Sequence, residues 1–267
     1  MLFCIQGRVL TLPIIPSNLT TYSITIDDLD GAYNNAITKG NPPKAIIITN
    51  PNNPLGKIYT KNELILFVNY CNMKSVHLIV DEIYALSVFD NVDDVVSNNN
   101  SIHNSDDKFQ SVTTILENKL NDNIHVIWGL SKDFGVSGSR AGLLYTQNKL
   151  LLASLSNFNM AFEVSNILQE IYEDILSDHT FIKDYLTLNS KLIQESYVLL
   201  TTGLNKLKIP FFHCHAGIFL FVDMSHLLKG NFINTLIILL LLQLSSSTIY
   251  RFPSQISFIL IVSCIVL

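Results

Sequence analysis

A lysine and an arginine flank a glycine- and serine-rich turn near the middle of the chain. Lys132 follows the short apolar run 125–128, and Arg140 comes eight positions later. A lysine amine that is shielded from water can lose its proton and form a Schiff base with an aldehyde. The Ser131 hydroxyl and the planar Arg140 guanidinium are suited to binding a phosphate group. The stretch therefore indicates a pyridoxal phosphate site, although a lysine and an arginine beside a glycine turn are more often simply solvated.

An acidic residue and a tyrosine stand at the end of another apolar run upstream. Residues 77–80 have the pattern of a buried strand, and Asp81 and Tyr84 follow directly. Open sheets bind ligands in the crevice at the carboxyl ends of their strands. A buried carboxylate there would keep a pyridine nitrogen protonated, and a phenol beside the ring hydroxyl would tune the Schiff base. The competing interpretation is that Asp81 and Glu82 only cap a helix.

A third polar group follows the apolar run 45–49. The sequence NPNNPLG contains two Asn-Pro pairs, which exclude helix and favour a tight turn. This turn leaves the Asn53 side chain free to face a ligand at the carboxyl end of the preceding strand. The run itself is continuously apolar, which predicts a parallel strand buried on both faces.

The remaining pattern predicts the elements that position these groups. Thr60 and Glu63 form a capping box, and the helix that they begin should bury the stripe Leu64, Phe67, Val68 and Cys71. Further segments show the periodicity of secondary structure. The expected strands are 9–15, 125–128, 141–146 and one that ends at Asp223, and the expected helices are 27–39, 109–120, 165–176 and 181–207. Strands that alternate with helices predict an α/β fold, and the polar segment 91–108 should be a surface loop.

Composition excludes several other classes of protein. The net charge of −5 and the absence of a long basic block disfavour nucleic-acid binding. The four cysteines are far apart and form no CxxC pair, so their spacing indicates neither disulfides nor a metal site. The N-terminal residues lack the positively charged region of a signal peptide. We therefore expect a cytoplasmic protein.

The C-terminal part has a different character. Residues 232–244 and 256–267 are apolar runs separated by a polar stretch that holds Arg251. Each run is shorter than the ~20 residues of a membrane-spanning helix, so we expect no membrane association. The expected division is a partial cofactor-binding domain over 1–160, an interdomain helix with part of a small domain over 161–229, and an apolar tail over 230–267 that is foreign to the fold.

Three stretches together, NPNNPLG, DEIYA and SKDFGVSGSR, resemble the class I and II aminotransferases, and most closely their 1-aminocyclopropane-1-carboxylate (ACC) synthase-like group. The resemblance implies a three-layer sheet with helices on both faces and a pyridoxal phosphate cofactor. It also implies an amino acid as substrate, for a transaminase or an ACC synthase-type lyase, and a homodimer. Catalysis would depend on Lys132, Asp81 and Tyr84. Asn53 and Tyr84 would contact the ring hydroxyl, Asp81 the pyridine nitrogen, Lys132 the aldehyde, and Ser131 and Arg140 the phosphate.

The chain departs from the family in ways that limit these expectations. Gly129 occupies a position where plant ACC synthases have a phosphate-binding serine. The family has segments before residue 7 and after residue 228 that this chain lacks, so we expect a protein truncated at both ends, with unpaired sheet edges and an uncertain dimer. Neither Arg8 nor Arg251 matches the arginine that holds the substrate carboxylate. The alternatives are an inactive remnant or incomplete gene model, and a membrane-tethered binding protein that reuses the fold.

Overall fold

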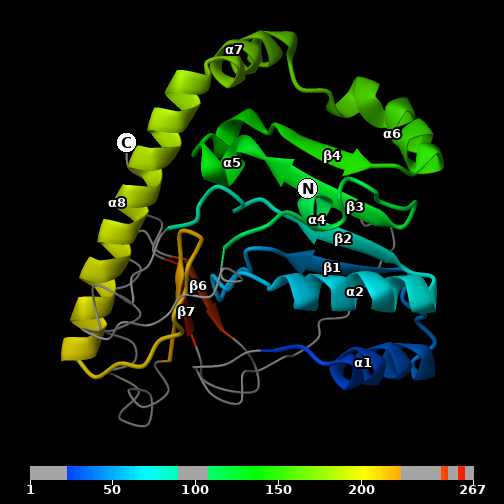
Figure 1. Cartoon of the computed structure of the whole chain (residues 1–267), viewed down its shortest axis with the longest axis horizontal. Coiled ribbons are helices and arrows are strands. Elements are labelled where there is room, and N and C mark those ends of the chain that lie inside the picture. Colours follow the sequence, from blue (N-terminus) through cyan, green and yellow to red (C-terminus); the bar gives the residue numbers. More distant parts are fainter. Residues whose placement is uncertain (1–22, 90–107, 224–247, 252–257, 262–267) are drawn as a thin grey trace.

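A computed structural model describes residues 23–89, 108–223, 248–251 and 258–261 (Figure 1). The polar segment 91–107 and the expected strand 9–15 lie outside the described residues. The helices are α1 (Ile26–Thr38), α2 (Lys61–Lys74), α4 (Val112–Ile115), α5 (Leu130–Asp133), the 3₁₀ helix η2 (Ser137–Ser139), α6 (Lys149–Phe162), α7 (Asn166–Ser177) and α8 (His179–Lys206). The strands are β1 (Ala45–Thr49), β2 (His77–Asp81), β3 (Ile124–Gly129), β4 (Gly142–Thr146), β5 (Leu220–Val222), β6 (Thr248–Arg251) and β7 (Phe258–Ile261).

The main sheet has four strands in the order β1-β2-β3-β4 (Figure 1). The pairs β1–β2 and β2–β3 are parallel, and β4 pairs antiparallel with β3. Three strands therefore end at one edge of the sheet, where Thr49 pairs with Asp81 and Asp81 with Ile127. This topology confirms the predicted α/β class with a mostly parallel sheet.

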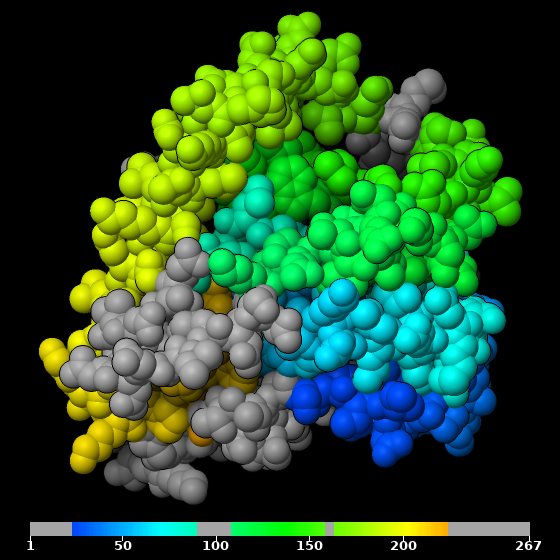
Figure 2. All heavy atoms as spheres, in the orientation of Figure 1, coloured from blue at the N-terminus to red at the C-terminus, as the bar shows by residue number. Residues whose placement is uncertain are grey.

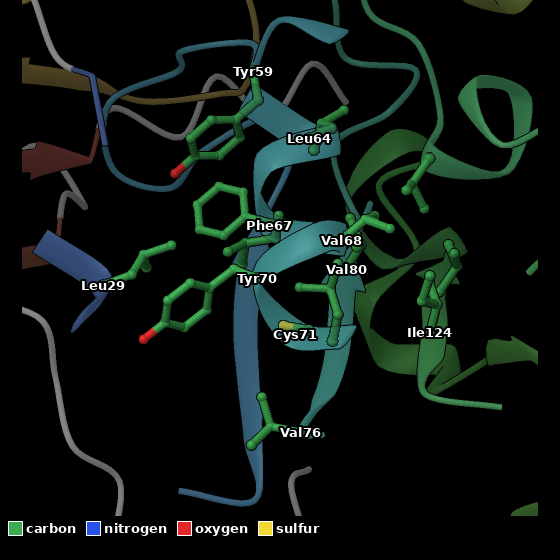
Figure 3. Close-up of a cluster of buried hydrophobic side chains, with 14 of the residues drawn as sticks. Leu29, Tyr59, Leu64, Phe67, Val68, Tyr70, Cys71, Val76, Val80 and Ile124 are labelled. Atoms are coloured by element: carbon green, nitrogen blue, oxygen red, sulfur yellow. The ribbon is translucent and has the colours of Figure 1, made fainter. Parts of the chain in front are cut away.

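Helices α1 and α2 pack on one face of this sheet and form its core (Figure 3). The four residues predicted as the inner stripe of α2 are all buried, and Phe67 meets the Tyr59 ring edge-on at a centroid distance of 5.7 Å. The predicted capping box begins the helix, because Thr60 Oγ1 accepts from Glu63 N–H and the Glu63 carboxylate accepts from Thr60 N–H. The local sequence and the tertiary packing therefore agree over this unit.

Strand β1 differs from its prediction in burial. Its partner and direction are as expected, but the Ile47 side chain is 47% exposed, so the prediction of burial on both faces was wrong. The physical reason is that α1 and α2 pack on the face that carries Ile46 and Ile48, while no described residue buries Ile47 on the opposite face. Within the described ranges, β1 and β4 each have a strand on one side only.

Two helices around β3 and β4 differ from the sequence analysis. The helix expected over 109–120 is reduced to α4, because Glu117 and Asn118 take left-handed backbone angles and end it early. Helix α6 was not predicted. Asn148 caps it by accepting a hydrogen bond from Leu151 N–H at 2.8 Å. Leu150 in its first turn is 82% exposed, and none of the side chains described over 149–157 is buried.

Helices α7 and α8 match the predicted segments 165–176 and 181–207 closely. The apolar face expected on α7 is largely uncovered by the described residues, because Ile167 and Ile171 are exposed. Helix α8 buries Ile193, Tyr197 and Leu204 in a second core with β5. In Figure 1 it runs along the side of the main sheet and leads into the second sheet.

The second sheet has the order β5-β7-β6 and is antiparallel. Strands β6 and β7 come from the C-terminal segment that was expected to be foreign to the fold, and β7 pairs directly with β5. Two pieces of that segment are thus part of a sheet, while the domain division as a whole remains a prediction. Among the described residues, none of the helices combines the length and the apolar character required to span a bilayer.

Two stacked histidines lie at the amino ends of β2 and β3. His77 Nδ1 lies 2.8 Å from His125 Nε2, and His125 Nδ1 lies 2.7 Å from Thr146 Oγ1. Burial, and secondarily the neighbouring His77, lower the pKa of His125. When His125 takes up a proton, both of its hydrogen bonds remain possible, because its two ring nitrogens can donate to His77 and Thr146. The proton, however, places a positive charge in a buried position.

The pair of His77 and His125 should make the protein less stable in mild acid. A base whose folded-state pKa is lowered contributes stability above its ordinary pKa of about 6.5 and loses it as the pH falls through the folded-state value. We therefore expect the free energy of unfolding to decrease as the pH is lowered from about 6.5. Denaturant unfolding at several pH values measures this, with His125→Gln as the variant and exposed His179→Gln as the control. An identical pH dependence in wild type and His125→Gln would contradict the prediction.

Candidate functional site

The carboxyl ends of β1, β2 and β3 bring the predicted residues to one edge of the sheet. The parallel ladder continues past the strands, because Asn50 N–H donates to Asp81 O at 2.9 Å and Glu82 N–H to Ile127 O at 2.8 Å. Asn53 follows β1, Asp81 ends β2 and Lys132 lies in α5, directly after β3. The shared strand direction therefore places residues far apart in sequence beside one another.

Asn53 and Tyr84 are in contact, as their predicted shared role requires. Asn53 Nδ2 donates to the Tyr84 hydroxyl at 3.5 Å. The Asn53 side chain is exposed, whereas Tyr84 is 4% exposed and meets the Phe219 ring edge-on at a centroid distance of 5.1 Å. A fixed phenol thus stands beside an amide that is open to a ligand.

The turn that carries Asn53 is fastened at both ends. Buried Asn50 accepts from Tyr59 N–H at 3.1 Å, and Gly56 N–H donates to Asn52 O at 2.7 Å. Gly56 has a φ of +64°, and a Cβ there would lie 2.3 Å from Cys214 Cβ. Only glycine fits this close approach of the turn to the segment before β5.

Asp81 and its neighbour Glu82 have separate surroundings. Glu82 is 5% exposed and accepts from Val112 N–H at 2.9 Å, so it binds the first turn of α4. Asp81 is half-buried on the other side and accepts from Ile83 N–H at 3.1 Å. Burial raises the pKa of Asp81, although the Ile83 hydrogen bond opposes that rise. Residues 83–86 form a turn and no helix, so neither carboxylate caps a helix that follows it directly. Glu82 binds the distant α4 instead, and Asp81 binds the turn.

Lys132 and Ser131 are both half-buried in the short helix α5. The loop that follows is tied back to this helix, because Ser137 Oγ donates to Ser131 O at 2.8 Å. Arg140 is exposed, has a left-handed φ of 55° and donates from one guanidinium nitrogen to Ser137 O at 2.9 Å. Two hydrogen bonds in series thus connect the Arg140 guanidinium to the backbone of Ser131.

The close packing of β3 against β4 explains why glycine occupies position 129. A Cβ on Gly129 would lie 2.9 Å from Ala141 O and 3.2 Å from Gly142 Cα, both of them backbone atoms. Here β4 begins directly against the end of β3, with Gly129 paired to Gly142. The close approach of these two strands leaves no room for a side chain.

Introducing serine at this position is therefore expected to destabilise the fold rather than improve a phosphate site. The free energy of unfolding of Gly129→Ser should fall by about 1–3 kcal/mol, the usual cost of overpacking. Denaturant unfolding measures this cost. Gly138→Ser is the matched control, because a Cβ there meets nothing within 4 Å. Equal stability of Gly129→Ser and the control would show that the strands can separate without cost.

Two residues that support the site, Phe219 and Asp133, were not predicted from the sequence. Phe219 lies against Tyr84, and its ring also fills the space beside Gly217, where a Cβ would be 2.8 Å from the ring. Asp133, next to Lys132, is fully buried. The available signal for Asp133 was a second charged residue directly beside Lys132 in the otherwise uncharged stretch 126–139, whereas nothing local marks Phe219.

Comparison with known proteins points to one family. The model of the family "Aminotransferase class I and II" matches residues 6–252. The chain is 34% identical over 223 residues to 1-aminocyclopropane-1-carboxylate synthase 11 of Arabidopsis thaliana, covering 82% of this chain and 45% of that protein. It is 35% identical over 210 residues to "probable inactive 1-aminocyclopropane-1-carboxylate synthase-like protein 2" of Mus musculus, covering 78% of this chain and 34% of that protein. The chain thus spans less than half the length of these relatives.

Solved structures show the same fold at lower sequence identity. N-succinyldiaminopimelate aminotransferase from Mycobacterium tuberculosis superposes with a TM-score of 0.70 at 16% identity, covering 94% of this chain and 60% of that one. The PLP-bound C-S lyase from Staphylococcus hominis gives a TM-score of 0.68 at 18% identity, with 91% and 57% covered. These structures share the arrangement of elements described above.

Proposed function

We propose a function for this chain, which belongs to the class I and II aminotransferase family: it binds pyridoxal phosphate at the carboxyl edge of β1 to β3 and acts on amino acids. The observation that carries the proposal is the Asn53–Tyr84 contact beside Asp81, at the same sheet edge as Lys132. Relatives at 34–35% identity are named as ACC synthases or ACC synthase-like proteins, which supports this branch of the family.

The chemistry of the residues fits this cofactor. Asp81 is half-buried with a raised pKa, and none of the ion pairs among the described residues includes it. A carboxyl group in such a position is stabilised as an anion by a cation such as a protonated pyridine nitrogen. Asn53 and Tyr84 offer an amide and a phenol to the ring hydroxyl. Ser131 and Arg140 would hold the phosphate, and Lys132 the aldehyde carbon.

When bound, the cofactor supplies an electron sink that stabilises negative charge at the substrate Cα. The chain's own residues determine how far that chemistry proceeds. Asp81 would keep the positive charge on the ring nitrogen, and the Tyr84 phenol would hold the ring hydroxyl in one orientation. The Lys132 amine would move the proton at the substrate Cα.

The test of this function is a panel of amino acids added to the PLP-loaded protein. Absorbance changes of the cofactor show binding, and quantified keto acid or cyclic amino acid products distinguish a transaminase from an ACC synthase-type lyase. Alanine, aspartate and S-adenosylmethionine cover these possibilities. A folded protein that takes up no PLP would contradict the proposal.

A second function is a PLP-binding chain without turnover. Two relatives of this chain, in Mus musculus and Homo sapiens, are described as probable inactive ACC synthase-like proteins. PLP uptake without any change on adding amino acids would support this second function.

We place the protein in the cytoplasm, which the two free cysteines among the described residues, Cys71 and Cys214, support.

A further inference from the structure

The residue directly after Lys132 is a fully buried carboxylate that accepts three hydrogen bonds. Asp133 Oδ1 accepts from the Ser87 hydroxyl at 2.7 Å. Asp133 Oδ2 accepts from Trp128 Nε1–H at 2.8 Å and from Leu86 N–H at 3.1 Å. The side chain has no exposed surface, and all three hydrogen bonds reach its two oxygens. Burial raises the pKa of Asp133, and these hydrogen bonds oppose that rise.

These bonds join the two chain segments that carry the proposed cofactor groups. Leu86 and Ser87 follow Tyr84 within three residues, and Asp133 is bonded covalently to Lys132. The same turn is also held from α8, because the Tyr185 hydroxyl donates to Asp133 O at 3.3 Å and the Tyr185 ring stacks on Phe134. Figure 2 shows α8 passing alongside these teal and green segments.

We propose that Asp133 is a positioning residue whose carboxylate fixes the turn bearing Lys132 to the segment bearing Tyr84. The amine and the phenol then keep a constant separation before any cofactor arrives, which lowers the cost of capturing it. The inference rests on the proposed function for its role toward PLP. The clamp itself is a property of the free protein and is tested there separately.

The shape of the network predicts which substitutions it tolerates. In Asp133→Asn, the amide oxygen can take the position of Oδ2 and accept from Trp128 and Leu86. The amide N–H₂ then faces Ser87, whose hydroxyl can reverse its role and accept. Asn therefore keeps all three contacts and removes only the charge. Ala removes every contact and leaves three donors without that partner, of which the Ser87 hydroxyl is buried.

A purely electrostatic role predicts a different order of variants. If the negative charge of Asp133 acted on the Lys132 amine, Asn and Ala would be equally impaired. If the hydrogen bonds position the turn, Asn resembles wild type and only Ala is impaired. Ser87→Ala and Trp128→Phe each remove one donor and should give intermediate effects, so the order remains measurable if Asp133→Ala fails to fold.

The experiment compares wild type with these four variants and with Glu82→Gln. Glu82 is a matched control, because it is also a buried carboxylate but binds α4 instead of the Lys132 turn. In the free protein, amide hydrogen exchange over residues 84–87 reports on the clamp in every variant. Emission from Trp128, the only tryptophan of the chain, reports on it in all variants except Trp128→Phe. In the presence of PLP, the rate of borohydride-trapped labelling of Lys132 reports on positioning.

We expect Asp133→Ala to accelerate exchange over 84–87, to shift the Trp128 emission and to slow labelling about ten- to a hundredfold, as when the hydrogen bonds behind a ligating group are removed. Asp133→Asn and Glu82→Gln should stay close to wild type in all three. Equal impairment of Asn and Ala, or no change on removing Ser87 and Trp128 donors, overturns the inference. If wild type itself takes up no PLP, the proposed function fails, and the exchange and emission results alone decide the clamp.

Discussion

Replacing Lys132 with alanine is expected to leave no pyridoxal phosphate on the chain after borohydride reduction. Lys132 is the lysine that follows β3 at the carboxyl edge of the sheet, and it is half-buried. Partial burial favours the neutral amine that a Schiff base requires. Intact-mass measurement before and after reduction quantifies the attached cofactor. The loss should be complete in Lys132→Ala.

The control for this prediction is Lys149→Ala. Lys149 begins α6, is exposed and lies at the opposite end of β4 from the site. This variant should keep the wild-type amount of label. Equal labelling of wild type and Lys132→Ala would show that PLP reacts with surface lysines and that the assigned anchor is wrong.

Replacing Asp81 with asparagine is expected to slow removal of the substrate Cα proton far more than it weakens PLP binding. An amide cannot balance the positive charge of a protonated ring nitrogen, so the electron sink is lost while the phosphate and ring-hydroxyl contacts remain. Removing one preorganised electrostatic partner of a reacting group costs about 10²- to 10³-fold in rate. Exchange of the alanine Cα proton for deuterium, followed by NMR, measures this step without requiring complete turnover.

Glu82→Gln again provides the comparison for Asp81→Asn, since the two carboxyl groups are adjacent in sequence and have separate partners. We expect Glu82→Gln to affect stability through α4 and to leave the exchange rate per folded molecule unchanged. An Asp81→Asn protein that exchanges the proton as fast as wild type would refute the assigned role.

The sequence predicts those features that depend on neighbouring residues. The capping box of Thr60 and Glu63 and the buried stripe of α2 are local patterns, and both have the expected form. The placement of Asn53, Asp81 and Lys132 at one sheet edge also follows from local signals. Each residue ends or follows a short apolar strand, and the carboxyl ends of parallel strands meet at one edge.

Features that depend on distant parts of the chain were beyond the sequence patterns. The exposure of Ile47 depends on which face of β1 the helices α1 and α2 cover. The role of Asp133 depends on Leu86 and Ser87, which lie more than forty residues away in the sequence. The pairing of β7 with β5 similarly joins segments that composition alone separates.

The central claim is that Asn53, Asp81, Tyr84, Ser131, Lys132 and Arg140 form one cofactor site. The most direct test is a crystal structure of the protein after incubation with pyridoxal phosphate. We expect the pyridine nitrogen at the Asp81 carboxylate, the ring hydroxyl between Asn53 and Tyr84, and the phosphate at Ser131 and Arg140. Cofactor density at another location, such as the apolar groove lined by Phe89, Tyr197 and Leu220, with none at Lys132, would contradict the account.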